Sequence, residues 1–365
     1  MMERTAVYPA LDAGGRIESA TAAAALDSRT VPRVAISSRF LLGIYAVLPL
    51  CVLAMFLDQM FWGGSLSRAL PKNPQRYFLF QLLFGTPHIV ASSVILATNG
   101  KYFRAYRMRL VLLTLLILAF FGGGSLFIPN GFFLAVVGVV TVIHVLKQQV
   151  GVGKGLCRLP GRLYDTWGLT LVVLGSVLYY PLYSDRELST ASADLLRGVL
   201  WALAALSVVL TLFCHPRIKT TKGRLYLWAN TLMVLLSAMF YARGYPFLAI
   251  LGPRLVHDLT AFTFYVTHDV NRHGAEPRNV LYRAASRLGL GIFWVCPAVA
   301  VLLTYLIVRF ADPLVQFITA PVLGYSLPHS AGFLLAGYLG LLHYYTEAFT
   351  WRQGSPYRRH VALTP

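Results

Sequence analysis

The sequence contains few charged side chains, and acidic ones are especially scarce. Charged residues make up 13% of the 365 positions, and 14 Asp and Glu face 32 Lys and Arg. The four cysteines lack CxxC spacing, so nothing indicates a disulfide framework or a zinc finger. No Walker or Rossmann glycine loop and no GxSxG motif is present. The sequence therefore gives no sign of a nucleotide-binding or serine-hydrolase domain.

Hydrophobic residues, by contrast, are abundant. They make up 57% of the chain, and the mean hydropathy is +0.62. This composition is typical of a polytopic membrane protein. We expect an all-α helical bundle that forms one transmembrane domain over 38–350, between an N-terminal tail at 1–37 and a C-terminal tail at 351–365. Ten segments are long enough, or nearly so, to cross a bilayer: about 38–58, 77–98, 108–128, 131–150, 163–183, 193–213, 225–243, 245–270, 288–310 and 327–350.

The basic residues alternate along the chain. Both tails and every second connection together hold 23 Lys and Arg, whereas the five other connections hold five. By the positive-inside rule, both termini lie in the cytoplasm and the chain crosses the membrane ten times. The net charge of +18 then reflects orientation and contact with anionic membrane lipids, and we expect no nucleic-acid partner. We expect an integral protein of the bacterial inner membrane.

One apolar stretch, residues 253–273, carries an unusual number of ionisable side chains. Such groups are costly at bilayer depth, so a helix retains them only when they pair, bind a ligand or line a path. Arg254 and Asp258 are four residues apart and can pair along one helix face. His257 and His268 share a face but are separated by a rise of roughly 16 Å, so they cannot bind one metal ion. This spacing predicts a functional helix.

Three other predicted spans carry a histidine near a polar residue or a helix break. A Gly-Pro break precedes His88, and irregular helices at membrane depth usually line a cavity. His144 and Gln148 are four residues apart, so the amide can orient the imidazole. His343 and Glu347 are also one turn apart, a spacing that suits two ligands of one metal or a ligand and its base.

These histidines share a depth in the predicted topology. His88, His144, His257 and His343 all lie on even-numbered spans, between the bilayer midplane and the cytoplasmic side, and no odd-numbered span has a histidine. Unrelated packing histidines are the alternative explanation. Converging imidazoles suit a transition metal, and histidine sets with a carboxylate suit non-haem iron that activates O₂. We expect these four residues, with His268 as a fifth candidate, to bind one or two iron ions.

Polar neighbours complete the predicted site. We expect Glu347 to act as a further ligand or base, and Gln148 and Asp258 to orient imidazoles. Arg254 would neutralise Asp258 or bind an anionic head group, and Asp269 would support the adjacent histidine. The surroundings are rich in apolar and aromatic residues, which suits a lipophilic substrate that arrives from the bilayer.

Two short motifs, Gly85-x-x-His88 and His144 with a polar residue four positions on, resemble motifs of the Brp/Blh β-carotene dioxygenases. The resemblance covers about residues 77–270. It implies a polytopic fold with histidine-bound non-haem iron; members of that family cleave β-carotene into two retinal molecules. The family's aspartates beside these histidines are absent here, and Ala261 stands where its later histidine pair would continue from His257. The resemblance therefore implies a metal and a lipophilic substrate as a class, and not carotene itself.

The sequence thus predicts a membrane metalloenzyme, a non-haem iron oxygenase acting on an isoprenoid- or lipid-like substrate with a cytoplasmic electron donor. A haem-b electron carrier is one alternative, but the pairs His257/His268 and His329/His343 have unequal spacings and match poorly in depth. A Soret band would favour this alternative. A proton- or ion-coupled transporter that uses Arg254, Asp258 and the histidines as a relay is the other, and Asp258-dependent uptake would favour it.

Overall fold

Helices form nearly all of the secondary structure in this computed structural model. It describes residues 34–72, 77–120, 127, 130–159, 161–183, 188–274, 277, 279–324, 331–352 and 354–364. Most of the predicted N-terminal tail, and His329, lie outside the described residues. The helices are α2 (Ser38–Ile44), α3 (Val47–Phe61), α4 (Ser65–Ala69), α5 (Phe78–Phe80), the π-helical turn η2 (Gln81–Gly85), α6 (Pro87–Thr98), α7 (Gly100–Leu118), α8 (Asn130–Cys157), α9 (Arg162–Tyr183), α10 (Thr190–Cys214), the 3₁₀ turn η5 (His215–Arg217), α11 (Thr221–Ala242), α12 (Pro246–His273), α13 (Val280–Arg287), α14 (Ile292–Leu323), α15 (Ala331–Thr350) and the 3₁₀ turn η6 (Arg358–His360).

Six of these helical stretches are long and apolar enough to cross a membrane. They are Ser38–Phe61, Phe78–Thr98, Ala135–Cys157, Thr190–Arg217, Thr221–Ala242 and Ile292–Val322. The predicted all-helical class is confirmed, and the molecule has the helices that an integral membrane protein needs. The other four predicted spans fall at least partly in α7, α9, α12 and α15, which do not reach this combination of length and apolarity within the described residues. Ten crossings stay a prediction.

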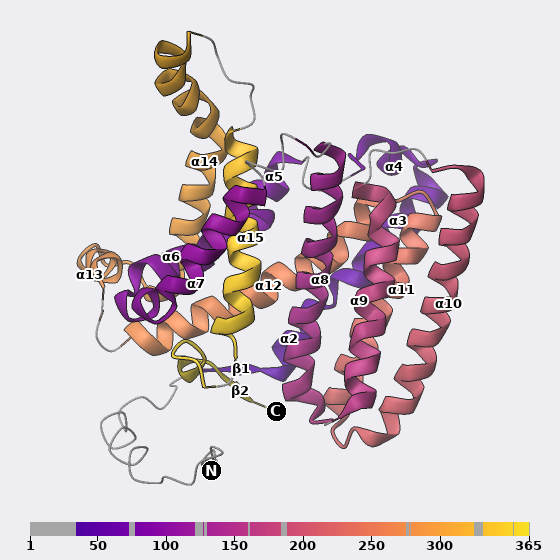
Figure 1. Ribbon diagram of the computed structural model, residues 1–365. Coiled ribbons are helices and arrows are strands. Elements are labelled where there is room, and N and C mark those ends of the chain that lie inside the picture. Colours follow the sequence, from indigo (N-terminus) through magenta and orange to yellow (C-terminus); the bar gives the residue numbers. More distant parts are fainter. Residues whose placement is uncertain are drawn as a thin grey trace.

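Helices α8, α9, α10 and α11 stand side by side as an upright bundle (Figure 1). The buried indole of Trp167 on α9 donates to Thr211 on α10 at 3.0 Å and to Thr231 on α11 at 3.1 Å. Glycine allows α8 and α9 to approach closely, because a Cβ at Gly168 would lie 2.7 Å from Val150. Small residues and hydrogen bonds between helices are the interactions that hold helices together in lipid.

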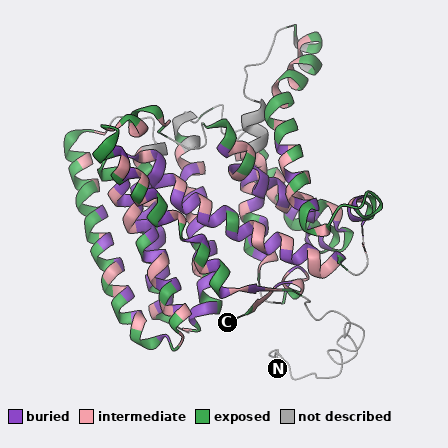
Figure 2. Ribbon diagram, turned by 180° about the vertical axis from the view of Figure 1, so that it is seen from behind, coloured by how far each residue is buried: buried purple, intermediate pink, exposed green. Residues whose placement is uncertain are grey.

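A second group, α6, α12, α14 and α15, packs beside this bundle. Helix α12 runs obliquely across the middle of the molecule and contacts α6, α8, α11 and α14 (Figure 1). Buried residues line the inside, whereas the outer helix faces are exposed (Figure 2). Many exposed side chains are apolar, such as Leu115 and Leu116, which are 57% and 66% exposed. Apolar outer faces of this kind suit contact with lipid chains.

The helix break predicted next to His88 is present as the π-helical turn η2, which Thr86 separates from Pro87 at the start of α6. Proline cannot donate a backbone hydrogen bond, so the helix is irregular at this point. The Gly85 carbonyl accepts a hydrogen bond from Nη2 of Arg254 at 2.7 Å. This hydrogen bond therefore connects the segment just before α6 to α12.

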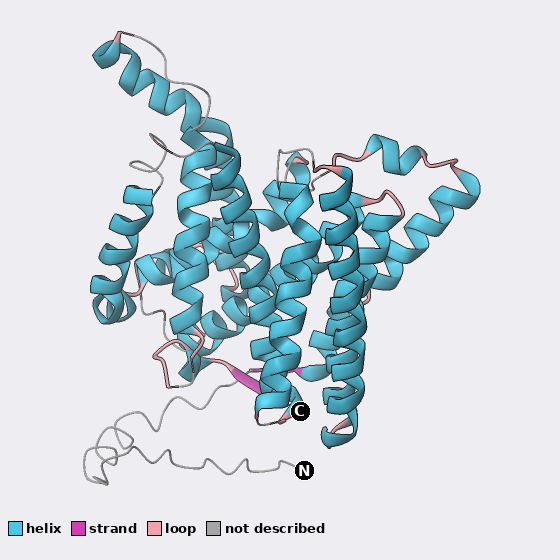
Figure 3. Cartoon of the chain, turned by 45° about the vertical axis from the view of Figure 1, so that its right-hand side comes forward, coloured by secondary structure: helices cyan, strands magenta, loops and turns pink. Residues whose placement is uncertain are grey.

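The two ends of the described chain meet at one end of the molecule. Strand β1 (Ala35–Ser37) pairs in parallel with β2 (Ala362–Thr364), with Ile36 opposite Leu363 (Figure 3). The predicted C-terminal tail is thus partly ordered against the segment before α2. One predicted connection, residues 311–326, is mostly helical, because α14 continues to Leu323 through Pro313. In an apolar environment a helix satisfies most of its backbone groups internally, which favours this continuation.

Candidate metal centre

Four histidines from four helices meet in the interior. They are His88 on α6, His144 on α8, His257 on α12 and His343 on α15. The ring centroids of His88 lie 5.0 Å from His257 and 4.8 Å from His343, and those of His144 lie 4.9 Å from each of the same two rings. The side chain of His144 is 8% exposed and the other three are completely buried. The four imidazole rings thus form one cluster in which each ring contacts two others, as their shared depth predicts.

Hydrogen-bond acceptors define the tautomer of His88. Its Nδ1 lies 3.1 Å from Oδ1 of Asp258 and 3.3 Å from the Phe84 carbonyl. Because both neighbours are acceptors, we assign the proton to Nδ1, which leaves a lone pair on Nε2. That Nε2 lies 3.3 Å from Nε2 of His257. The prediction that Asp258 orients an imidazole agrees with this arrangement.

The tautomer of His343 follows from Ser92. The Ser92 hydroxyl donates to the Ile89 carbonyl at 2.8 Å, so its oxygen is free to accept from Nδ1 of His343 at 2.8 Å. The lone pair of His343 is then on Nε2. This nitrogen is buried, lies 3.9 Å from Oε2 of Glu347 and has no hydrogen-bond partner. An acceptor on one ring nitrogen and a bare second nitrogen is the usual arrangement of a histidine that binds a metal.

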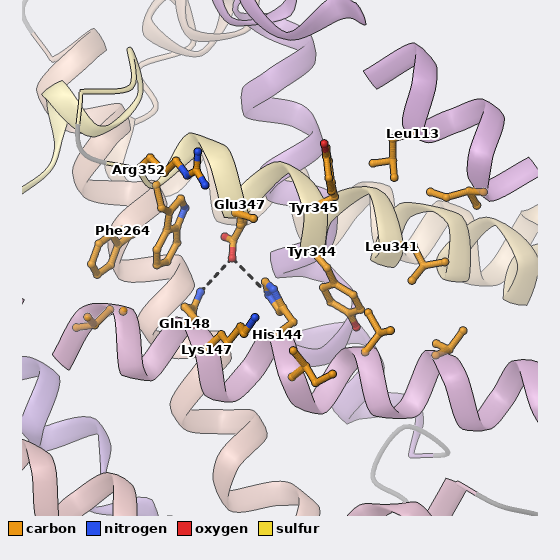
Figure 4. A pocket seen from close by; sticks show the side chains of 18 of the residues that line it. Leu113, His144, Lys147, Gln148, Phe264, Leu341, Tyr344, Tyr345, Glu347 and Arg352 are labelled. Carbon is orange, nitrogen blue, oxygen red and sulfur yellow. Dashed lines mark hydrogen bonds and ion pairs between the residues drawn. The ribbon is translucent and has the colours of Figure 1, made fainter. Parts of the chain in front are cut away.

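Glu347 closes one side of the cluster. Its Oε2 lies 3.4 Å from Nε2 of His144 and accepts from Nε2 of Gln148 at 3.2 Å (Figure 4). Its Oε1 accepts from the hydroxyl of Tyr265. The sequence predicts that Gln148 orients an imidazole; in the structure its amide donates to the carboxylate of Glu347 on α15. Two donors thus fix the carboxylate beside the histidines.

A second polar layer supports Gln148. Its Oε1 accepts from Nε2 of Gln149 at 3.4 Å. The Oε1 of Gln149 in turn accepts from the hydroxyls of Tyr226 at 2.8 Å and Tyr45 at 3.1 Å. All four residues are buried. This chain of hydrogen bonds connects α2 and α11 to the carboxylate and limits its movement.

Arg254 and Asp258 form the predicted pair. Nε of Arg254 lies 3.3 Å from Oδ2 of Asp258, and both side chains are buried. Asp258 also contacts His88 and therefore lies between the guanidinium of Arg254 and the imidazole cluster. A buried carboxylate needs such a partner, so neutralising Asp258 is the role that the geometry supports.

The donor atoms fall into two sets that could each hold a metal ion. One set is His88, His257 and His343; the other is His144, His343 and Glu347, and within each set the ligand atoms lie within 4.8 Å of one another. Nε2 of His144, like that of His343, makes no hydrogen bond although it is buried. Imidazole nitrogens with a carboxylate fit iron, zinc, copper or nickel. The residues present could therefore hold a transition-metal ion of this group, iron among them.

His268 lies outside both sets. Its Nδ1 is 2.9 Å from Oδ1 of Asp269, and its Nε2 is 2.8 Å from the hydroxyl of Tyr102. The ring stacks on Tyr357 with centroids 4.3 Å apart. The structure thus does not bring this predicted ligand to the other four histidines. Both of its ring nitrogens are already engaged by Asp269 and Tyr102. Asp269 supports the adjacent histidine, as expected, but away from the cluster.

This second cluster ties the C-terminal segment to α12 and α7. The hydroxyl of Tyr282 donates to Oδ2 of Asp269, and burial together with that carboxylate raises the pKa of Tyr282. Arg272 donates to the Tyr102 hydroxyl at 2.8 Å and lies over its ring. Burial also raises the pKa of Tyr102, so both phenols stay protonated and can donate. These contacts hold α7 and the C-terminal segment against the end of α12.

An apolar cavity of about 820 Å³ adjoins the histidines between α7, α8 and α15. His144, Gln148 and Glu347 form part of its wall, and Tyr344 stacks on the ring of His144 at 4.4 Å (Figure 4). A cavity of this size can take a large lipophilic molecule. The carboxylate and one imidazole of the site therefore face a space suited to a substrate.

Sequence reasoning did not single out Tyr265 or Gln149. Tyr265 lies eight residues after His257 on the same helix face, so two turns of α12 lead from the imidazole to the phenol. That spacing was the only available signal, and aromatic residues are frequent throughout this chain. Ser92 lies one turn after His88 in the sequence, but its hydroxyl contacts Nδ1 of His343 on another helix.

Comparisons with models of protein families, with curated proteins and with solved structures find no match for this chain.

Proposed function

We propose that this protein is an integral membrane metalloenzyme, a non-haem iron oxygenase that acts on a lipophilic, isoprenoid- or lipid-like substrate. The observation that supports this most strongly is the pair of buried Nε2 atoms of His144 and His343, which make no hydrogen bond and lie 3.4 Å and 3.9 Å from Oε2 of Glu347. A buried polar atom without a hydrogen bond is costly, and a bound metal would remove that cost. Iron bound there would supply the activation of O₂.

The surrounding residues have separate tasks in this proposal. Asp258 and Ser92 hold His88 and His343 with their Nε2 lone pairs toward the centre. Tyr265 and Gln148 hold the Glu347 carboxylate at the cavity wall. The stacking of Tyr344 on His144 screens the imidazole from one side. Each contact fixes a group before substrate arrives, which reduces the reorganisation that the reaction needs.

The cellular setting belongs to the same proposal. Ten crossings with cytoplasmic termini would place the histidines toward the cytoplasmic half of a bacterial inner membrane, within reach of a cytoplasmic electron donor. The apolar cavity beside Glu347 favours entry of substrate from the bilayer. The faint motif similarity to the Brp/Blh dioxygenases points to the same class of chemistry.

A haem carrier receives less support from the geometry. A porphyrin with two axial histidines must fit between their rings. Here neighbouring imidazoles contact one another edge to face, with centroids at most 5.0 Å apart. This packing suits a small ion better than a flat macrocycle.

Metal content and a visible spectrum of the detergent-purified protein test the proposal. Cells are grown with iron, zinc, copper and nickel supplied, and metals are quantified by ICP-MS. We expect one or two irons per chain without a Soret band. A Soret band would replace the proposal with a haem carrier. Folded protein without metal, combined with Asp258-dependent uptake in proteoliposomes, would replace it with a transporter.

A further inference from the structure

The cavity beside Glu347 is charged at one end only. Its lining contains three basic residues, Lys147, Arg352 and Arg358, and a single acidic one, Glu347. The Glu347 carboxylate is engaged by Gln148 and Tyr265. Among the described residues, none of the three basic side chains forms an ion pair with an acidic side chain. Positive charge is therefore available at this end of the cavity.

The opposite end of the cavity is apolar. Its lining there comes from α7, α8 and α15 and includes Leu116, Val137, Val140 and Leu341. The labelled side chains in Figure 4 follow this division, with Arg352 near Glu347 at one end and Leu341 and Leu113 toward the other. Leu116 lines this end of the cavity and is 66% exposed, so the apolar end is open at α7. A molecule that fills this space needs a long apolar part and a negatively charged end.

From this division we infer that the cavity binds a lipid with an anionic head group, carboxylate or phosphate, held by Lys147, Arg352 and Arg358. The inference rests on the proposed function and narrows its substrate class. Basic side chains form charge-assisted hydrogen bonds with such oxygens. The hydrocarbon chain lies along the apolar walls, where burial keeps it away from water. An uncharged hydrocarbon such as a carotene would leave the basic end unsatisfied.

Helix geometry determines which part of the bound lipid lies beside the histidines. Lys147 is three residues beyond His144 on α8, a rise of roughly 4.5 Å. Arg352 is five residues beyond Glu347, just past the end of α15 at Thr350. On the other side of His144 the part of the lining that comes from α8 is apolar as far back as Val136, a rise of roughly 12 Å. The head group thus sits close to the reactive centre, and the reacting carbon lies a few bonds from it.

Equilibrium binding of radiolabelled stearate and of its methyl ester to the purified full-length protein tests this inference. The two probes share one hydrocarbon chain and differ only in charge. We expect stearate to bind about tenfold or more tightly than the ester, the difference that one or two charge-assisted hydrogen bonds provide. Inorganic phosphate should not displace stearate, because it lacks the chain. Displacement by phosphate alone would show an anion site and overturn the inference.

Neutralising the basic end gives the matched comparison. The double variant Lys147→Gln/Arg352→Gln should lose about tenfold or more in stearate affinity while its affinity for the ester stays unchanged. Both side chains are exposed, so the variant should fold. Arg104→Gln, an exposed position on α7 outside the cavity, is the control and should bind both probes as the unaltered protein does. Equal stearate affinity in the double variant and the control would overturn the inference.

Metal analysis of the same preparations separates this inference from the proposed function. Bound iron with no preference between stearate and the ester would leave the oxygenase proposal intact and overturn the anionic-lipid inference. A clear preference for stearate in protein that binds no metal would support the lipid site and contradict the oxygenase.

Discussion

The carboxylate of Asp258 lies 3.1 Å from Nδ1 of His88, in a fully buried contact that joins α12 to α6. The same carboxylate lies 3.3 Å from Nε of Arg254. The Asp258 carboxylate therefore has three roles. It balances the buried charge of Arg254, fixes the tautomer of His88 and holds α12 against α6. Its removal should affect both metal binding and stability.

Asp258→Asn should lower metal affinity by about 10- to 100-fold, the usual cost of losing a polar partner behind a metal ligand. It should also destabilise the protein by about 3 kcal/mol or more, because the buried guanidinium of Arg254 would lose the carboxylate charge that lies 3.3 Å from its Nε. Titration of metal-depleted protein with Fe(II) and thermal unfolding measure the two effects. Asp194→Asn, at an exposed position, is the control. Unchanged affinity in Asp258→Asn would contradict the role assigned to the contact.

Ser92→Ala should reduce metal affinity by about tenfold, because the acceptor for Nδ1 of His343 is lost and the ring can rotate or change tautomer. Ser93→Ala offers a close comparison on the same helix. The hydroxyl of Ser93 donates only to the Ile89 carbonyl, at 3.4 Å. The same Fe(II) titration applies, and equal losses in the two variants would mean that Ser92 does not position His343.

His268→Ala should retain the full metal content, since both nitrogens of this ring are bound to Asp269 and Tyr102. It should still lower the melting temperature, because it removes a buried hydrogen-bonded ring stacked on Tyr357. Metal analysis and thermal unfolding on one preparation separate the two effects. Loss of metal from folded protein would restore His268 as a ligand.

Gly168→Ala should destabilise the α8–α9 interface by about 1–3 kcal/mol, because the added methyl would lie 2.7 Å from the stiff side chain of Val150. Gly198→Ala provides the matched control on α10, where no atom lies within 4 Å of the added carbon. That change should be neutral or slightly stabilising, since alanine favours helix. Unfolding in a mild detergent compares the two, and equal stability would contradict the close packing.

Much of the architecture is predictable from the sequence, because apolar length is a strong signal in membrane proteins. Every predicted span falls at least partly in a helix. The course of α14 was less predictable, since residues 311–326 carry no Lys or Arg and contain two prolines, which resembles a connection. The helix nevertheless runs through Pro313 to Leu323. Local sequence did not reveal that the backbone could remain helical there.

The site was predictable only in part, for a different reason. Histidine is rare enough in these helices that a common depth singles out His88, His144, His257 and His343. Tyrosine is common, with 20 in the chain, so nothing distinguished Tyr265 before its contact with Glu347 was seen. The spacing between His257 and His268 excludes one shared ion but leaves a second ion possible. Only the contacts of His268 with Tyr102 and Tyr357, which come from distant segments, show that its ring is engaged elsewhere.

The most direct test of the account is the iron content of His343→Ala, since this histidine belongs to both possible ligand sets. His215, which accepts from the indole of Trp228 away from the cluster, supplies the control variant His215→Ala. Both are purified from iron-supplied cells and measured by ICP-MS beside the unaltered protein. We expect stoichiometric iron in the control and none in folded His343→Ala. Equal iron in both variants would contradict the proposed metal centre.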